Sequence, residues 1–155
     1  MQEKCPITRV YAYEQPVKGG AFPGGVVEEG ENQSKNILSG GQSNYLVYML
    51  SNQKDVVIPT VLWIKGRGHE VRMDTITTLP VRLTNSGRTI QLVPSTSKRV
   101  ISLSPGPVLN FFAPPPPELQ ALLDKNDMVI EYRWKKETCY FPVDKIKLLE
   151  TVAAE

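Results

Sequence analysis

Short runs in which apolar and polar residues alternate recur along this chain, and their period of two is what most constrains its fold. In the run 128–134, Met128, Ile130 and Tyr132 alternate with Glu131 and Arg133. Successive side chains of a β-strand point to opposite faces of a sheet, so this spacing is typical of a strand with one buried face. We therefore expect a chain built mainly from strands.

Similar runs, separated by turn-forming residues, predict most of the fold. We expect strands at 7–13, 44–50, 56–65, 70–76, 79–84, 89–93, 99–103, 128–134 and 138–143, with a last short strand or helical turn at 146–149. Glycine, asparagine and lysine turns join several of them into hairpins. Pro59 has no N–H for a strand ladder and predicts an edge position, a bulge or a break, whereas Ser104–Pro107 should end the strand before it.

A single helix is expected, near residues 117–125. Four prolines at 114–117 precede it, and proline is tolerated in the first helical turn. Leu119, Leu122 and Leu123 fall on one side, and Asn126 is a candidate left-handed stop. Because strands and helices do not alternate, doubly wound folds and TIM barrels are excluded. An all-β antiparallel sandwich or barrel fits best, and we favour the two-sheet sandwich.

The length of 155 residues predicts one domain over 1–155. Within it, residues 16–42 form a long glycine-rich loop with an acidic cluster at Glu28, Glu29 and Glu31. Connections of this length are usually either functional or disordered, and we favour a disordered or merely covering loop. Catalytic carboxylates need a buried or coupled environment, so we interpret this cluster as solvated charge.

Charge and hydropathy exclude two classes of partner. The net charge of +2 is far below the basic excess of most phosphate-backbone binders, so we expect no nucleic acid ligand. No apolar run reaches the roughly 18 residues of a transmembrane helix.

Cys5 and Cys139 are the two cysteines, and they either pair, if the compartment is oxidising, or remain separate thiols.

The sequence offers little for catalysis or for a cofactor. His69 is the single histidine, and Met73 stands where a zinc protease motif needs a second one. We find no nucleophile elbow, no phosphate-binding glycine motif and too few ligands for a zinc site. We therefore expect no catalytic residue, no metal and no cofactor, and we interpret His69 as a surface turn residue.

Three regions are candidate contact surfaces: the glycine loop around Phe22, the turn Arg67–His69, and the segment Phe111–Pro117 with Phe112. The last is the most distinctive, because two aromatics precede a polyproline run. It either presents an aromatic and polyproline II surface to a partner, or forms a crossover whose phenylalanines seal the end of a sandwich. We favour the crossover.

Three stretches, VYAYEQP (Val10–Pro16), LVPSTSK (Leu92–Lys98) and LDKNDMVI (Leu123–Ile130), resemble small uncharacterised bacterial exported proteins with immunoglobulin-like sandwiches. The resemblance spans most of the chain and implies a periplasmic or secreted location with the signal removed, a cytoplasmic location being the alternative. It implies no catalytic or binding residues.

Together these observations favour a non-enzymatic interaction or structural module of the bacterial envelope, which recognises a protein or cell-surface ligand. The alternatives are a carbohydrate or small-molecule binding domain and, less favoured, a small hydrolase using His69. An exposed Trp63 or Trp134 would favour a sugar ligand, and a large apolar patch would favour a protein partner. A carboxylate and a hydroxyl beside His69 would favour catalysis.

Overall fold

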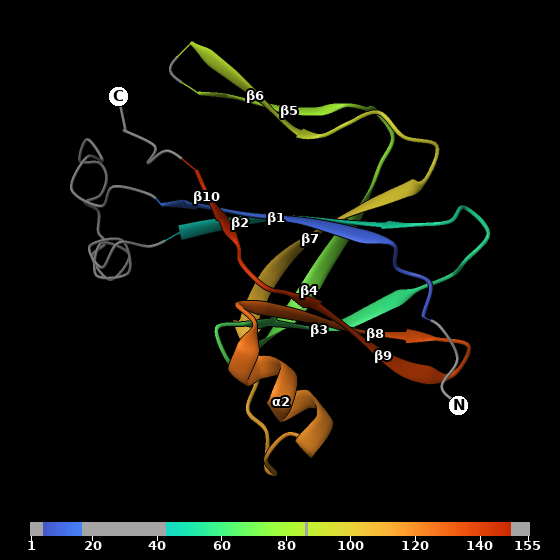
Figure 1. Cartoon of the computed structure of the whole chain (residues 1–155), viewed down its shortest axis with the longest axis vertical. Coiled ribbons are helices and arrows are strands. Elements are labelled where there is room, and N and C mark those ends of the chain that lie inside the picture. The colour runs from blue at the N-terminus through green and yellow to red at the C-terminus, as the bar shows by residue number, and fades with distance from the viewer. Residues whose placement is uncertain (1–4, 17–42, 86, 150–155) are drawn as a thin grey trace. The chain divides into compact units, whose positions relative to one another are not determined.

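The computed structural model describes residues 5–16, 43–85 and 87–149, and these are mainly β-structure with one short helix (Figure 1). The strands are β1 (Arg9–Pro16), β2 (Ser43–Ser51), β3 (Ile58–Ile64), β4 (Arg67–Ile76), β5 (Val81–Asn85), β6 (Arg88–Val93), β7 (Arg99–Val108), β8 (Met128–Trp134), β9 (Glu137–Val143) and β10 (Lys147–Leu148). The helix α2 spans Pro117–Lys125. The predicted predominance of strands and the helix near 117–125 are confirmed.

Eight strands belong to one sheet, in the order β10-β1-β2-β7-β4-β3-β8-β9, while β5 and β6 form a separate two-stranded ribbon. The pair β1 and β10 is parallel, so the main sheet is mixed. An immunoglobulin-like sandwich divides its strands between two antiparallel sheets. The structure therefore differs from the predicted antiparallel two-sheet arrangement, because eight strands hydrogen-bond into one sheet and the final strand lies parallel to the first.

The chain divides into two compact units, which we describe separately. The larger comprises Met1–Ala12 and Val47–Ile146. The pairs among β2 to β9 are antiparallel, and the hairpins β3–β4, β5–β6 and β8–β9 have the predicted pairing. Pro59 lies at a register shift in the β3–β8 pair, which is one of the outcomes expected for it.

The smaller unit comprises Tyr13–Leu46 and Lys147–Glu155. In its described part, Tyr13 and Glu14 of β1 pair with Lys147 and Leu148 of β10. The Glu14 carboxylate accepts a hydrogen bond of 2.7 Å from the Ser43 hydroxyl. The glycine-rich loop that the sequence predicts lies mostly outside the described residues, since 17–42 are not described.

Strand β7 continues five residues beyond its predicted end, to Val108, so the expectation that Ser104–Pro107 stops it is wrong. The register with its partner β4 shifts between the pairs His69–Val108 and Val71–Pro105, so that Gly106 and Pro107 of β7 together face the single residue Glu70. A bulge of this kind lets a strand absorb residues that cannot donate to the ladder. The extension brings the chain beyond β7 to the start of β4, where the Leu109 N–H donates to the Gly68 carbonyl at 2.8 Å.

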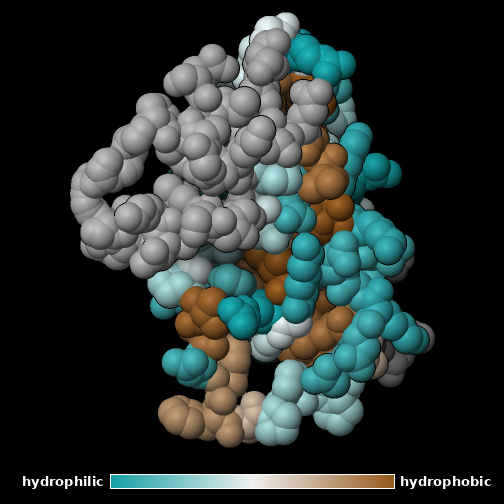
Figure 2. Space-filling model, turned by 90° about the vertical axis from the view of Figure 1, so that its left-hand side faces the viewer, coloured by the Kyte–Doolittle hydropathy of each residue, from teal (hydrophilic) through white to brown (hydrophobic). Residues whose placement is uncertain are grey.

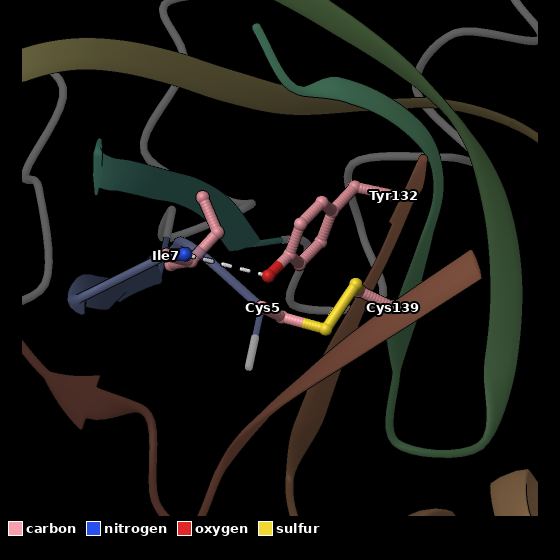
Figure 3. Close-up of a disulfide and its surroundings, with 4 residues drawn as sticks. All are labelled: Cys5, Ile7, Tyr132 and Cys139. Atoms are coloured by element: carbon pink, nitrogen blue, oxygen red, sulfur yellow. Dashed lines mark hydrogen bonds between the residues drawn. A yellow bond between two sulfur atoms is a disulfide. The ribbon is translucent and has the colours of Figure 1, made fainter. Parts of the chain in front are cut away.

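The period of two gives strands β3, β8 and β9 two distinct faces. On one face, Leu62 opposes Ile130, and Tyr132 opposes Cys139. This face is tied to the N-terminal segment by a disulfide between Cys5 and Cys139, and the Tyr132 hydroxyl accepts a 3.4 Å hydrogen bond from the Ile7 N–H (Figure 3). The bridge makes Cys5 part of the larger unit.

The opposite face is covered by α2. Its buried Leu119 packs with Val61 and Trp63 of β3 and Val129 of β8, and Leu122 and Leu123 pack at the edge of this cluster. The side of the helix with Leu119, Leu122 and Leu123 thus faces the sheet, as predicted. Asn126 is extended, with φ of −128°, so the predicted left-handed stop is wrong. Instead, its backbone N–H and its side-chain amide both donate to the Leu122 carbonyl, which ends the helix.

Candidate functional site

The structure brings together two of the three predicted contact regions. The β3–β4 hairpin turns at Lys65 and Gly66, which have φ of 51° and 84°, a conformation typical of tight two-residue hairpins. Gly68 then lies opposite Trp63. Because the chain beyond β7 is hydrogen-bonded to Gly68, the segment Phe111–Pro117 starts directly beside the turn Arg67–His69.

Phe111 stacks on Trp63, and Gly68 makes room for it. The two ring centroids lie 5.1 Å apart with 19° between the planes. A Cβ at Gly68 would lie 2.9 Å from Phe111 Cε2 and 3.1 Å from Trp63 Cζ3, so the two rings would have to move to admit it. Trp63 is buried at 5% exposure, whereas Phe111 is 51% exposed and Phe112 fully exposed at 107%. Phe111 thus covers the indole, while Phe112 faces solvent and the predicted sealing role does not apply to it.

An open pocket of about 430 Å³ lies between these aromatics, the proline run and α2. Its walls come from β3, β8 and β9, from the segment after β7 and from the helix; they are Trp63, Phe111, Phe112, Ala113, Pro114, Pro115, Pro116, Leu119, Glu131 and Tyr140. In Figure 2, apolar surface lies at the lower end of the view, where Figure 1 places α2 and the segment before it. We call the pocket lined by these ten residues the proline pocket.

Glu131 is the charged residue in the lining of the proline pocket. It lies on β8 between Val61 of β3 and Tyr140 of β9, so all three share one face of the sheet. The Trp63 indole Nε1–H donates to Glu131 Oε1 at 3.0 Å. The bond orients both side chains, and the carboxylate is left with acceptor capacity for further donors.

The Tyr140 phenol lies in a negative environment. Partial burial raises its pKa, and the nearby carboxylates of Glu131 and Glu118 raise it further. Glu118 belongs to the first turn of α2, where a carboxylate is favoured by the helix dipole. The hydroxyl of Tyr140 therefore stays protonated at neutral pH and can donate a hydrogen bond.

His69 lies outside the proline pocket lining and has a structural contact. Its Nδ1 is 3.1 Å from the Gly106 carbonyl oxygen, a contact that joins β4 to the bulged part of β7. The described hydrogen bonds bring no carboxylate or hydroxyl side chain to this imidazole. Among the described residues, no group of three or more His, Cys, Asp and Glu side chains is arranged to hold a metal ion.

Two further predicted residues are not found in the described lining of the pocket. Arg67 is exposed at the start of β4, opposite Ile64, and does not line the pocket. Phe22 lies outside the described residues. Sequence reasoning missed Glu131 and Tyr140. The β8–β9 alternation puts them opposite each other, but nothing in the sequence indicates that β3 pairs with β8 and brings Trp63 to the same place.

A second depression, of about 630 Å³, surrounds the β8–β9 turn, and the sequence analysis did not predict it. Exposed Val56 and Ile58 line it together with Lys54, Asp55, Arg133, Trp134, Lys135 and Lys136. The Lys135 ammonium lies 4.6 Å from the centroid of the Trp134 ring. Lys135 and Lys136, next to each other beside Trp134, are the sequence feature from which this depression could have been predicted.

Compared with models of protein families, with curated proteins and with solved structures, the chain matches none of them. Within the described ranges, no helix has both the length and the apolar character needed to cross a bilayer.

Proposed function

We propose that the chain is a non-enzymatic binding module of the bacterial envelope, which recognises a segment of another protein at the proline pocket. The observation that carries the proposal is the exposure of Phe112 beside the half-exposed Phe111, at the mouth of this pocket. Soluble proteins seldom leave adjacent large aromatics in water, and such patches are characteristic of interaction sites.

The construction of the pocket supports the same proposal. Trp63 is fixed by its stacking on Phe111 and by the hydrogen bond to Glu131, so the floor exists before a partner arrives. Prolines have little conformational freedom to lose, which lowers the entropic cost of binding at their surface. Aromatic and proline surfaces of this kind are a recurring mode of peptide recognition.

The proposed envelope location has the disulfide as its support. Cysteine pairs persist in oxidising compartments such as the periplasm and are rare in the cytosol. The Cys5–Cys139 bridge is therefore what an exported protein is expected to contain.

A carbohydrate or small molecule is the second candidate, favoured by the size of the proline pocket. About 430 Å³ lies within the range of small-ligand sites, roughly 300–1,000 Å³. However, Trp63 and Trp134 are 5% and 9% exposed, so neither offers the open indole face on which a sugar ring would stack. We therefore rank this candidate below a protein partner.

Selection of peptides from a random phage-displayed library on the immobilised full chain tests the proposal. We expect enriched peptides whose affinity falls at least tenfold for Phe112→Ser, the effect of losing an aromatic that contributes more than about 1.4 kcal/mol. Ile58→Ser is the matched control, because Ile58 is also exposed, at 53%, but lies outside the pocket lining. The proposal fails if no peptide is enriched, or if binding is insensitive to Phe112→Ser.

A further inference from the structure

The chemistry of the proline pocket indicates the charge of what it binds. Four aromatic side chains, Trp63, Phe111, Phe112 and Tyr140, contribute to its walls. The negative faces of aromatic rings attract cations, most strongly where water is excluded. Three prolines and Leu119 make up most of the remaining lining and have no charge of their own.

The one charged group in the described lining, the Glu131 carboxylate, is negative and therefore also attracts cations. The Glu131 carboxylate is held by the Trp63 indole at 3.0 Å, next to the aromatic walls, and it is half-buried, so solvent screens it less than a surface carboxylate. No lysine or arginine belongs to the described lining, and Glu118 adds a second negative charge close to Tyr140. An anion would be repelled here, whereas a cation gains Coulomb attraction to the carboxylate that a neutral group does not.

We infer that the proline pocket binds an alkylammonium group, either the side-chain ammonium of a lysine or a quaternary ammonium such as that of choline. The cation would lie against the exposed rings of Phe111 and Phe112, within reach of the Glu131 carboxylate. A carboxylate surrounded by aromatic rings is selective for ammonium groups because it combines Coulomb attraction with cation–π contacts. The inference deepens the proposed function, since it names the chemistry that a partner presents to this pocket.

Titration of the full chain with choline, followed by the indole N–H signals in NMR spectra, tests the inference without any partner. The chain has two tryptophans, Trp63 in this pocket and Trp134 in the depression around the β8–β9 turn. We expect choline to shift the Trp63 signal and leave that of Trp134 in place. The neutral isostere 3,3-dimethyl-1-butanol, which has the same shape without the charge, should bind at least tenfold more weakly.

Two variants separate the charge from the rings. Glu131→Gln keeps an oxygen that accepts from the Trp63 indole but removes the charge, so choline affinity should fall about tenfold while that of the isostere is unchanged. Glu137→Gln on the same hairpin, exposed and opposite Trp134, is the matched control and should have no effect. Phe112→Leu alters a fully exposed ring and leaves the fold intact, and it should weaken choline binding several-fold.

Parallel titrations with N-acetyl-lysine methylamide and its trimethylated form identify the source of the cation. Binding of the lysine compounds supports a protein source, and binding of choline alone supports a small quaternary ammonium. The inference is overturned if choline and its isostere bind equally, if Glu131→Gln has no effect, or if only the Trp134 signal responds. Peptide selection that succeeds while every ammonium probe fails would leave the proposed function standing without this ligand class.

Discussion

At the scale of single residues, burial and cross-strand register decide what each side chain does. Ser51, the last residue of β2, is fully buried, and its hydroxyl has no hydrogen-bond partner within the described ranges. A buried hydroxyl without a partner loses its hydrogen bonds to water and forms none in the folded protein, which lowers the stability. The hydroxyl is therefore expected to destabilise the folded state, since it follows the buried hydrophobic residues 47–50 of the strand.

Replacement of Ser51 by alanine is expected to raise the free energy of unfolding by about 1 kcal/mol, because it removes the unsatisfied hydroxyl and leaves the backbone pairing intact. Urea denaturation measures the change. Ser104→Ala, on an exposed position of β7, is the control and should stay within about 0.5 kcal/mol of the parent chain. A loss of stability in Ser51→Ala would indicate that the hydroxyl has a partner after all.

Tyr140 predicts a pH dependence of stability. Its pKa is raised in the folded protein, first by burial and then by Glu131 and Glu118. In the unfolded chain it titrates near its usual pKa of about 10. Above about pH 10 the unfolded chain has lost the Tyr140 proton, whereas the folded protein still holds it. The stability that the protonated Tyr140 contributes below pH 10 is therefore lost as the pH rises through the pKa of the folded state.

We therefore expect the free energy of unfolding to fall above about pH 10 less steeply in Tyr140→Phe than in the parent chain. Urea denaturation across this pH range measures both slopes. Tyr48 and Tyr132 also have raised pKa values from burial, so part of the fall should persist in the variant. Identical slopes would rule out a contribution from Tyr140.

At the scale of elements, turn chemistry separates two otherwise similar hairpins. The β3–β4 turn has Gly66 at φ of 84°, whereas the β8–β9 turn has Lys135 and Lys136 at φ of 52° and 65°. Residues with a Cβ adopt this left-handed conformation at a cost of about 1–2 kcal/mol. The second hairpin forms at that cost because β8 is held on both sides, by β3 and by β9.

Lys136→Gly should stabilise the chain by up to about 1 kcal/mol, since glycine adopts the left-handed conformation freely and Lys135 keeps its contact with Trp134. Gly66→Ala is the reciprocal test. A Cβ there would meet no atom within 4 Å, so backbone conformation alone should destabilise the chain by about 1 kcal/mol. Thermal unfolding compares the two, and changes of the same sign would contradict this account.

The elements that could be predicted from sequence are those whose signals are local. The β8–β9 alternation and the leucines of α2 fix which faces are buried, and the structure follows them. The length of β7 could not be predicted, because the strand continues through a bulge at Gly106 and Pro107 that depends on its pairing with the distant strand β4. The parallel pairing of β1 with β10 and the proline pocket depend on contacts between segments far apart in the chain, which leave no periodic signal.

At the scale of the whole molecule, the Cys5–Cys139 bridge spans 134 residues of sequence. It connects the N-terminal segment to β9, where Cys139 lies opposite the buried Tyr132 on the same face of the sheet. Closing so long a loop restricts the unfolded chain strongly, and the effect grows slowly with loop length. The bridge is therefore expected to contribute substantially to stability although it lies near one end of the chain.

Replacing both cysteines by alanine, or reducing the bridge, should lower the free energy of unfolding by about 2–5 kcal/mol. Denaturation curves with and without dithiothreitol measure the loss, and the double variant serves as the control because its curve should not respond to the reductant. A difference below about 1 kcal/mol would mean that the unfolded chain is already restricted in this region.

The same bridge makes most of the polypeptide a covalent ring. Proteolytic cleavage of one peptide bond between Cys5 and Cys139 leaves both fragments joined, and they separate in electrophoresis only after reduction. In single-molecule pulling from the two ends, the ring cannot lengthen: of 155 residues, only those before Cys5 and after Cys139 can extend fully, at about 3.5 Å each, until the sulfur–sulfur bond is cut.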